Sequence, residues 1–405
     1  MILKVVCAPT FGSYYYEDVA SLQGISVPES ERWFKSSETP GFTKMREVAE
    51  TISIGLSDGS RIAWGDCVGV SYAGKSGRKS LFRHEEGRRA IETIVAPWLR
   101  NQNIDSLRQF GLEWDSFRSA HQETLHPAIG YGLSQAILNY LAPAGDQFKV
   151  IAREWGLTTE NLEPIALQGS CGNNRYENAD KMIVRRIAAF PQSQVDDIKN
   201  QLGERGEVLR DYAKWLVARL AEFKLANYDP CITLDVHGAL GTIFQNNVTK
   251  VGDYLREIEE LLSPYKFRIE SPMLVESVES QIAIYSSLRN YLVKTGSKVQ
   301  LAADEWANTK QDIQKFADSR CVDLIHIKTP DLGSVVDVVD AVLYCKAQGM
   351  GVLLGGSCVE TDISTRATVH VAMATRPDFL LVKPGMGFDE GFMLCQGEMA
   401  RIRCM

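Results

Sequence analysis

Short apolar runs alternate with longer amphipathic stretches from residue 163 to the end of the chain. Eight such runs occur, at 163–168, 181–190, 231–236, 267–271, 299–305, 323–330, 351–357 and 379–385. Helical patterns lie between several of them, at 211–224, 251–265, 279–296, 308–320 and 333–349. Because parallel strands are joined by crossovers that are usually helices, eight strand–helix units predict an α/β fold of the (β/α)8 type. An open, doubly wound parallel sheet is the alternative.

The first 160 residues have a different pattern. An apolar run at 1–9 predicts a strand, and alternating apolar residues at 47–70, interrupted by Asp58-Gly59, predict a β-hairpin. Amphipathic stretches at 80–100, 106–120 and 126–142 predict helices. Strands followed by helices are typical of an α+β domain. We therefore expect an α+β domain over residues 1–160 and a barrel domain over residues 161–405.

Charge and cysteine content argue against several classes of protein. The chain has 405 residues, 44 basic against 51 acidic, with no block of Lys or Arg, so neither nucleic acid nor an anionic membrane is an expected partner. The apolar runs fall well short of the roughly 18 residues that a membrane helix needs. Residues 1–13 lack the features of a secretory signal. The nine cysteines are irregularly spaced, so we expect reduced thiols in a cytoplasmic protein.

Carboxylates end three successive predicted strands. In a parallel barrel, working residues lie at the C-terminal ends of strands. Asp235, Glu270 and Asp304 are 35 and 34 residues apart, which is one strand–helix unit each. This spacing predicts three converging carboxylates at one level of the barrel, a donor set that suits Mg²⁺. A single acid at a strand end is more often a helix N-cap or a salt-bridge partner, so the prediction depends on all three together.

The sixth run places a histidine and a lysine on one face. Because side chains alternate along a strand, His326 and Lys328 are expected to point into the barrel while Ile325 and Ile327 face the helices. Beside a divalent cation and partly desolvated, Lys328 is expected to have a lowered pKa and to act as a general base. The alternatives are an ion pair between Lys328 and a carboxylate, and a His326 that is only hydrogen-bonded.

The seventh run ends in a turn of small residues, Gly355-Gly356-Ser357-Cys358. Small residues let backbone N–H groups approach an anion, so this turn is a candidate site for a substrate carboxylate. A Gly-rich turn without a ligand is the alternative. A cation beside an inward-facing lysine indicates removal of a proton next to a carboxylate, as in the enolase superfamily.

Ten segments resemble the methylaspartate ammonia-lyase branch of the enolase superfamily. They are GFTKMREVAETISIGLSDG, WGDCVGVSYAGKSGR, RYENADKMI, LDVHGALG, RIESPM, ADEWANT, IKTPDLG, YCKAQGMG, GGSCVET and KPGMGFDEG. The resemblance implies an N-terminal α+β capping domain, a barrel, a homodimer, and reversible removal of ammonia from 3-methylaspartate to give mesaconate. It also implies Mg²⁺, with Mn²⁺ as an alternative, and a monovalent cation such as K⁺.

Carried over residue by residue, the resemblance assigns two sets of side chains. The metal ligands would be Asp235, Glu270 and Asp304. The base that removes the proton from the carbon bearing the β-carboxylate would be Lys328. The substrate-binding residues would include Gln168, Ser357 and Cys358 at a carboxylate and Leu381 at the methyl group.

Ser357 stands where the family has a threonine, and three further departures from the family pattern matter more. Gln192 replaces a histidine that is the second acid/base, on the opposite face of the substrate. His326 replaces a glutamine that contacts the metal-bound carboxylate, and Ser71 replaces a glutamine near the substrate amine. The hypothesis that follows is a divergent ammonia-lyase with an altered substrate or stereochemistry, in which His326 partly takes over as a catalytic residue.

Two alternatives remain open from the sequence. One is another enolase-type reaction on a different carboxylate, such as dehydration, another β-elimination or epimerisation. The other is a non-catalytic binding protein that kept the fold.

Overall fold

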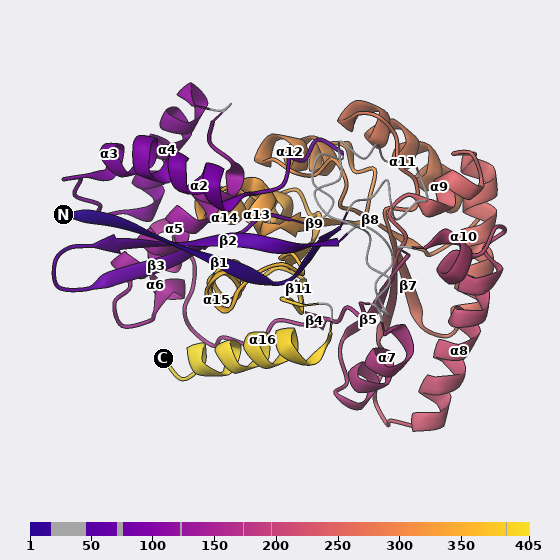
Figure 1. Cartoon of the computed structure of the whole chain (residues 1–405). Helices are drawn as coiled ribbons and strands as arrows, with labels where there is room; N and C mark the ends of the chain where they lie inside the picture. The colour runs from indigo at the N-terminus through magenta and orange to yellow at the C-terminus, as the bar shows by residue number, and fades with distance from the viewer. Residues whose placement is uncertain (18–45, 71–75, 122–123, 173, 196, 386) are drawn as a thin grey trace.

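The computed structural model describes residues 1–17, 46–70, 76–121, 124–172, 174–195, 197–385 and 387–405. Figure 1 shows a sheet with helices at the N-terminal side and a larger barrel beside it. We call the first part the cap. No helix among these residues is both long and apolar enough to cross a membrane.

The cap contains an antiparallel sheet with the order β1-β2-β3. Its strands are β1 (Lys4–Glu17), β2 (Arg46–Ser57) and β3 (Ile62–Cys67). The expected hairpin is confirmed: the Asp58 carboxylate accepts hydrogen bonds from the backbone nitrogens of Ser60 (2.8 Å) and Arg61 (3.0 Å), and Gly59 has φ +92°. An aspartate and a glycine stabilise such a turn because one caps its backbone and the other tolerates positive φ.

The described part of the cap also contains six helical segments, one of which packs closely against β3. They are α2 (His84–Ala90), η2 (Ile91–Val95), α3 (Ala96–Leu99), α4 (Leu107–Ala120), α5 (Pro127–Leu141) and α6 (Gln147–Trp155). Helix α5 approaches β3 so closely that a Cβ on Gly65 would lie 2.1 Å from the Gly132 carbonyl oxygen. Glycine at this position is therefore required by the packing.

The second part is a closed parallel barrel with the strand order β10-β11-β4-β5-β6-β7-β8-β9. This confirms the barrel over the open sheet. Its strands are β4 (Leu167–Gln168), β5 (Ala189–Gln194), β6 (Cys231–Asp235), β7 (Lys266–Glu270), β8 (Gln300–Ala303), β9 (Leu324–Lys328), β10 (Gly351–Gly355) and β11 (Phe379–Leu381).

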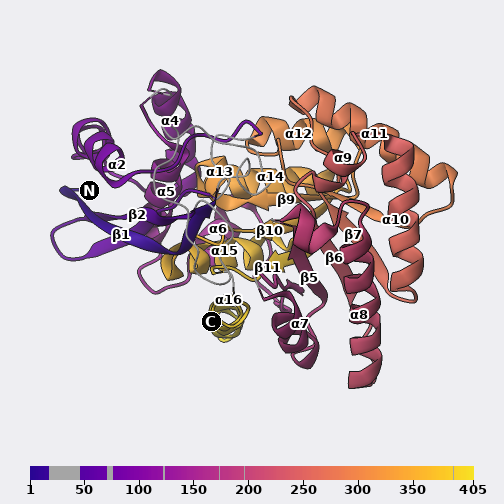
Figure 2. The same ribbon diagram turned by 45° about the vertical axis from the view of Figure 1, so that its right-hand side comes forward.

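Helices surround the barrel (Figure 2). They are α7 (Arg175–Val184), η3 (Ile198–Leu202), α8 (Glu207–Phe223), α9 (Ala239–Ile243), α10 (Val248–Leu262), α11 (Val278–Lys294), α12 (Lys310–Ser319), α13 (Thr329–Leu332), α14 (Val335–Ala347), α15 (Asp362–Thr375) and α16 (Asp389–Ile402).

The strand expected at 181–190 was wrong in its first half. Residues 181–184 end helix α7, whose N-cap Asn174 accepts a hydrogen bond from the backbone nitrogen of Glu177. The buried residues Ala179, Met182 and Ile183 have the spacing of one helical face. A short apolar run does not distinguish a buried strand from the buried side of a helix, and the spacing over the longer window decides here.

The inward-facing side chains form an apolar layer within the barrel. Ala302, Leu324, Leu353 and Leu381 form one buried cluster, against which Phe379 packs. Because side chains alternate along each strand, positions two residues further along face the same interior. The polar residues of the site occupy these positions at the C-terminal ends of the strands.

The register differs from the single row expected for the three acids. Asp235 pairs with Glu270, but Glu270 pairs with Ala302, so Asp304 lies two residues beyond the row. Strands in a closed barrel are staggered, so equal spacing along the chain does not give equal height. Asp304 keeps the inward orientation because the offset is two residues.

The cap also contacts the loop that follows β10. In β1, the backbone nitrogen of Ser13 donates to the Glu360 carbonyl (3.1 Å), and Ser13 Oγ donates to the Cys358 carbonyl (2.7 Å). A Cβ on Gly12 would lie 1.9 Å from the Val359 carbonyl oxygen. The cap therefore holds the turn predicted to bind a carboxylate.

Candidate active site

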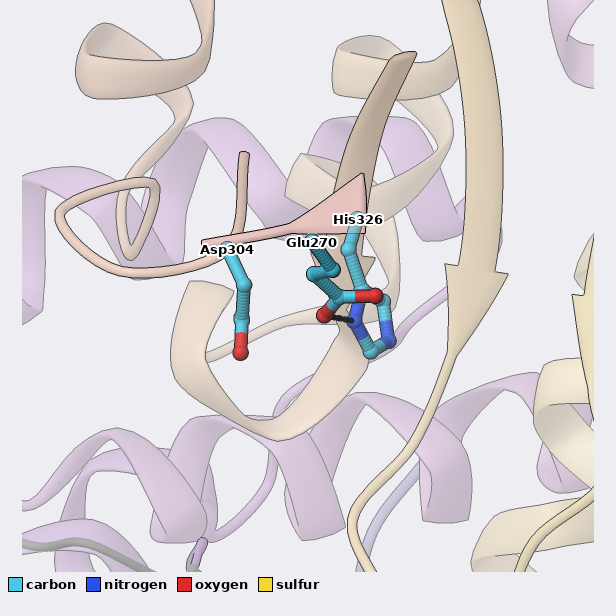
Figure 3. A group of neighbouring side chains, drawn as sticks. All are labelled: Glu270, Asp304 and His326. Atoms are coloured by element: carbon cyan, nitrogen blue, oxygen red, sulfur yellow. Dashed lines mark hydrogen bonds and ion pairs between the residues drawn. The ribbon is translucent and has the colours of Figure 1, made fainter. Parts of the chain in front are cut away.

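Three buried side chains converge at the C-terminal ends of β7, β8 and β9 (Figure 3). Glu270 ends β7, Asp304 directly follows β8, and His326 lies within β9. One ligand atom from each lies within 4.8 Å of the others, and His326 Nδ1 donates to Glu270 Oε1 at 2.8 Å. Two carboxylates and an imidazole at this spacing form a donor set that can hold a divalent cation.

Asp235 lies next to Glu270 but is not one of the three residues whose ligand atoms lie within 4.8 Å of one another. It is the register neighbour of Glu270, and its Oδ2 lies 3.0 Å from His237 Nε2. Burial raises the pKa of Glu270, and the negative charge of Asp235 raises it further. Carboxylates this close repel one another when ionised, so the site favours a cation that would neutralise them.

Lys328 reaches the same place from the end of β9. Its Nζ forms an ion pair with Asp304 Oδ2, the alternative that we considered for this residue. Burial and Arg78 lower the pKa of Lys328, but Asp304, Glu305 and Asp331 outweigh them, so the pKa is raised. We expected a lowered pKa for a lysine beside a bound divalent cation. Here Lys328 pairs with Asp304, and this ion pair stabilises its ammonium form.

Arg78 brings a second cation from the cap. Its Nη2 donates to Asp304 Oδ1 (3.1 Å) and its Nε to Asp331 Oδ2 (3.0 Å), with only 1% of the side chain exposed. Burial opposes ionisation of Asp304, but Lys328 and Arg78 hold its pKa well below the usual range. Asp304 is therefore ionised at neutral pH, as a metal ligand must be.

Two of the residues that depart from the family pattern flank one carboxylate. Gln192 Nε2 donates to Glu270 Oε2 at 3.2 Å, and His326 donates to the other oxygen. They lie on β5 and β9, with three strands between them. Gln192 Oε1 and His326 Nε2 are both buried without a hydrogen-bond partner in the described part of the chain. Unpartnered buried polar atoms are costly, so these two atoms indicate a site built for a polar ligand.

The turn after β10 is fixed by a buried glutamate. Glu360 Oε2 accepts from the backbone nitrogen of Ser357 (3.1 Å), and Oε1 accepts from the hydroxyls of Tyr131 (2.9 Å) and Thr329 (3.4 Å). Burial raises the pKa of Glu360 to about 7, although these hydrogen bonds partly offset it. One carboxylate thus joins the cap, the residue after Lys328, and the predicted carboxylate-binding turn.

The remaining expected residues that the structure describes lie around the same mouth. Gln168 and Leu381 are register neighbours on β4 and β11. A Cβ on Gly355 would lie 2.7 Å from Leu381 Cβ and 2.8 Å from His326 Nε2, so these side chains adjoin. Ser357 and Cys358 are buried in the turn after β10. Ser71 lies outside the described residues.

Family models match the whole of this architecture. A model described as the methylaspartate ammonia-lyase N-terminus matches residues 1–156, and one described as its C-terminus matches residues 158–405. The chain belongs to the methylaspartate ammonia-lyase family. A methylaspartate ammonia-lyase from Carboxydothermus hydrogenoformans is 38% identical over 403 residues, 99% of this chain and 97% of that protein.

Solved structures of family members superpose closely. A Citrobacter amalonaticus methylaspartate ammonia-lyase containing (2S,3S)-3-methylaspartic acid has a TM-score of 0.90 at 35% identity, covering 100% of this chain and 99% of the other. The magnesium complex of β-methylaspartase from Clostridium tetanomorphum has a TM-score of 0.85 at 34% identity, covering 100% and 98%. An L-Ala-D/L-Glu epimerase from Bacillus subtilis shares only the fold, at 13% identity and a TM-score of 0.63.

Three residues of this family member were missed by the sequence reasoning. Arg268 is two residues before Glu270 on β7, so alternation alone places it on the inner face. Arg78 and Glu360 lie within recognised motifs, but Arg78 pairs with Asp304 and Asp331 of the barrel, and Glu360 accepts from Tyr131 of the cap. No local pattern indicates such contacts.

Proposed function

We propose that this chain is a magnesium-dependent carbon–nitrogen lyase that eliminates ammonia from 3-methylaspartate or a close analogue. The observation that carries the proposal is the meeting of Lys328 with Asp304 at the mouth of the barrel, where Glu270 and His326 complete a cation-binding group. The bound ligands named for the Citrobacter and Clostridium structures support this substrate and this ion.

Asp235, Glu270 and Asp304 would hold the Mg²⁺. When bound, the ion stabilises the negative charge that develops on the substrate carboxylate as the adjacent proton leaves. Arg78 fixes Asp304 from the cap, and its hydrogen bond to Asp304 leaves the carboxylate ionised.

Lys328 is the base in this proposal. With Asp304 paired to the cation rather than to Lys328, the neutral Nζ accepts the proton from the carbon that bears the β-carboxylate. The electron pair of that C–H bond forms the new double bond, and the C–N bond of the substrate ammonium breaks with its electrons leaving on NH₃. Gln168, Ser357 and Cys358 hold a substrate carboxylate, and Leu381 provides an apolar contact for the methyl group. The products are an unsaturated dicarboxylate and NH₃, and the abstracted proton stays on Lys328 as an ammonium until it is released to solvent.

Gln192 stands where the family has a histidine and His326 where it has a glutamine, and both contact Glu270. This pair of replacements supports a second acid/base that differs from that of the family. Gln192 cannot transfer a proton at neutral pH, but its neighbour across the carboxylate, His326, can. A neutral imidazole that donates through Nδ1 carries its lone pair on Nε2. His326 Nε2 has no partner within the described residues, so we propose that it accepts or delivers a proton there. Ser71 in place of a glutamine remains a proposed contact near the substrate amine.

A second candidate function is another enolase-type reaction on a different carboxylate. It is favoured by the same departures, since Gln192, His326 and Ser71 change the donors around the substrate. Epimerisation is the weakest form, because it requires an acid/base on both faces and Gln192 supplies none. Dehydration or another β-elimination needs only Lys328 and a leaving group.

The remaining expectations are part of the proposal. They are a homodimer, a cytoplasmic location, a domain boundary near residue 160, activation by K⁺ and replacement of Mg²⁺ by Mn²⁺. A small amino-acid or carboxylate substrate, and neither nucleic acid nor a membrane, is the expected partner.

The test is ammonia release from a panel of amino acids. We expect magnesium-dependent formation of ammonia and mesaconate from 3-methylaspartate, with slower or no reaction of aspartate. Lys328→Met, which keeps the length of the side chain without the amine, should abolish it. Ammonia release from a different amino acid would support the proposed reaction and contradict the proposed substrate. Loss of water rather than ammonia would establish the second candidate.

A further inference from the structure

A buried arginine inside the barrel is not used by the proposed mechanism. Arg268 lies on β7 with 4% of its surface exposed, and its guanidinium carbon is 4.5 Å from the centroid of the Phe379 ring. Within the described residues it forms no ion pair, and its Nε has no hydrogen-bond partner. A cation kept in the interior without a counter-ion is expensive, so its retention requires a reason.

The hydrogen bond that Arg268 does make is to a predicted substrate-binding residue. Its Nη1 donates to Gln168 Oε1 at 3.0 Å, and Gln168 is itself 1% exposed. A guanidinium group can only donate hydrogen bonds. Of the two orientations open to the Gln168 carboxamide, only the one with its oxygen facing Arg268 can accept this hydrogen bond.

This contact fixes the other end of the amide. With its oxygen held, Gln168 presents its NH₂ group away from Arg268. That group makes no hydrogen bond to another described residue. Gln168 ends β4 at the mouth of the barrel, beside Leu381 on β11. Strand β11 separates β4 from β10, and Ser357 lies in the turn after β10. A carboxylate bound at this mouth needs donors, and a glutamine turned the other way would offer it an acceptor.

We infer that Arg268 is a positioning residue that orients the Gln168 carboxamide so that its NH₂ group donates to the substrate carboxylate. The inference deepens the proposed function and depends on it for the identity of the ligand. Arg268 contacts the ligand only through Gln168, so its effect should disappear when Gln168 is absent.

A double-mutant cycle tests this dependence. Arg268→Met removes the donor and keeps an apolar side chain against Phe379, and Gln168→Ala removes the amide. We expect each single variant to raise KM for 3-methylaspartate about tenfold and to change kcat less than about threefold. The lost hydrogen bond to the charged carboxylate stabilises the bound substrate and the transition state alike, so its loss weakens binding and leaves the chemical step nearly unchanged. The double variant should resemble Gln168→Ala, because the two residues act as one unit. Effects that multiply in the double variant would overturn the inference, as would an unchanged KM in Arg268→Met.

Two further variants separate positioning from a general effect on folding. Arg268→Lys retains the charge and one donor, so KM should lie between the wild-type and Arg268→Met values. Phe379→Leu removes the ring beside the guanidinium and leaves the hydrogen bond, so it should change KM less than twofold. A Phe379→Leu variant as impaired as Arg268→Met would assign the effect to packing and overturn the inference.

Binding of mesaconate with Mg²⁺, measured by calorimetry, distinguishes this inference from the proposed function. If the wild type binds mesaconate but releases no ammonia from 3-methylaspartate, the proposed reaction fails and the same cycle is measured in Kd. Non-additive Kd values would then support the role of Arg268. If the wild type binds neither mesaconate nor 3-methylaspartate, both the proposed function and the role of Arg268 are refuted.

Discussion

Glu360 provides a sharp test of the energetics of the site. Its carboxyl is 1% exposed, and in the described part of the chain it forms no ion pair with Lys, Arg or His. Its folded-state pKa is about 7, against an ordinary value of 4.5, because burial disfavours the charged form. A pKa raised in the folded state means that the carboxyl contributes stability that is fully present below pH 4.5 and is lost as the pH rises through 7.

The magnitude follows from the two pKa values. Their difference of about 2.5 corresponds to about 3 kcal/mol of stability at low pH that the folded protein lacks above pH 8. Glu360→Gln keeps the shape and cannot ionise, so it should escape this loss. Relative to the wild type, the variant should gain about 2 to 3 kcal/mol of unfolding free energy between pH 5 and pH 8.5.

Urea unfolding of both proteins at several pH values measures this difference directly. Glu85→Gln is a matched control, because Glu85 has 80% of its side chain exposed and should give no comparable pH dependence. Tyr131→Phe removes one hydrogen bond to the carboxylate and should steepen the pH dependence of the protein. A difference in unfolding free energy between wild type and Glu360→Gln that stays constant from pH 5 to 8.5 would show that ionisation of Glu360 does not destabilise the fold.

Three further outcomes are expected. Gly356→Ala should destabilise the protein by about 3 kcal/mol or more, measured by urea unfolding, because a Cβ there would lie 1.2 Å from Glu360 Oε2; equal stability would contradict the packing. His326→Gln should lower kcat by about 100-fold or more if the imidazole transfers a proton, whereas unchanged turnover would remove it from the chemistry. Mg²⁺ at about 100 times its Kd should stabilise the fold by about 3 kcal/mol in thermal unfolding, and an Asp304→Asn variant should lose that gain; an equal gain in the variant would place the ion elsewhere.

The barrel could be predicted because its signal repeats. Eight short apolar runs, separated by amphipathic helices, leave few folds that bury them all. The inward positions of His326 and Lys328 followed from alternation along a strand, which depends only on local geometry. Arg268 obeys the same rule two residues before Glu270 and could have been found in the same way.

Other features depend on how the parts of the chain meet. The height of Asp304 depends on the stagger between β7 and β8, which spacing along the chain does not encode. Arg78 and Glu360 acquire their roles only when the cap packs on the barrel. The pKa of Lys328 depends on whether Asp304 pairs with it or with a cation, and no sequence pattern decides between these partners.

The central claim is that Lys328 removes a proton next to a substrate carboxylate. Proton NMR in D₂O, with Mg²⁺ and 3-methylaspartate, tests it most directly, using a chelated sample and Lys328→Ala as controls. We expect the signal of the proton on the carbon bearing the β-carboxylate to disappear, and mesaconate to form, only when both Mg²⁺ and Lys328 are present. The same loss in the Lys328→Ala variant, or in the chelated sample, would contradict it.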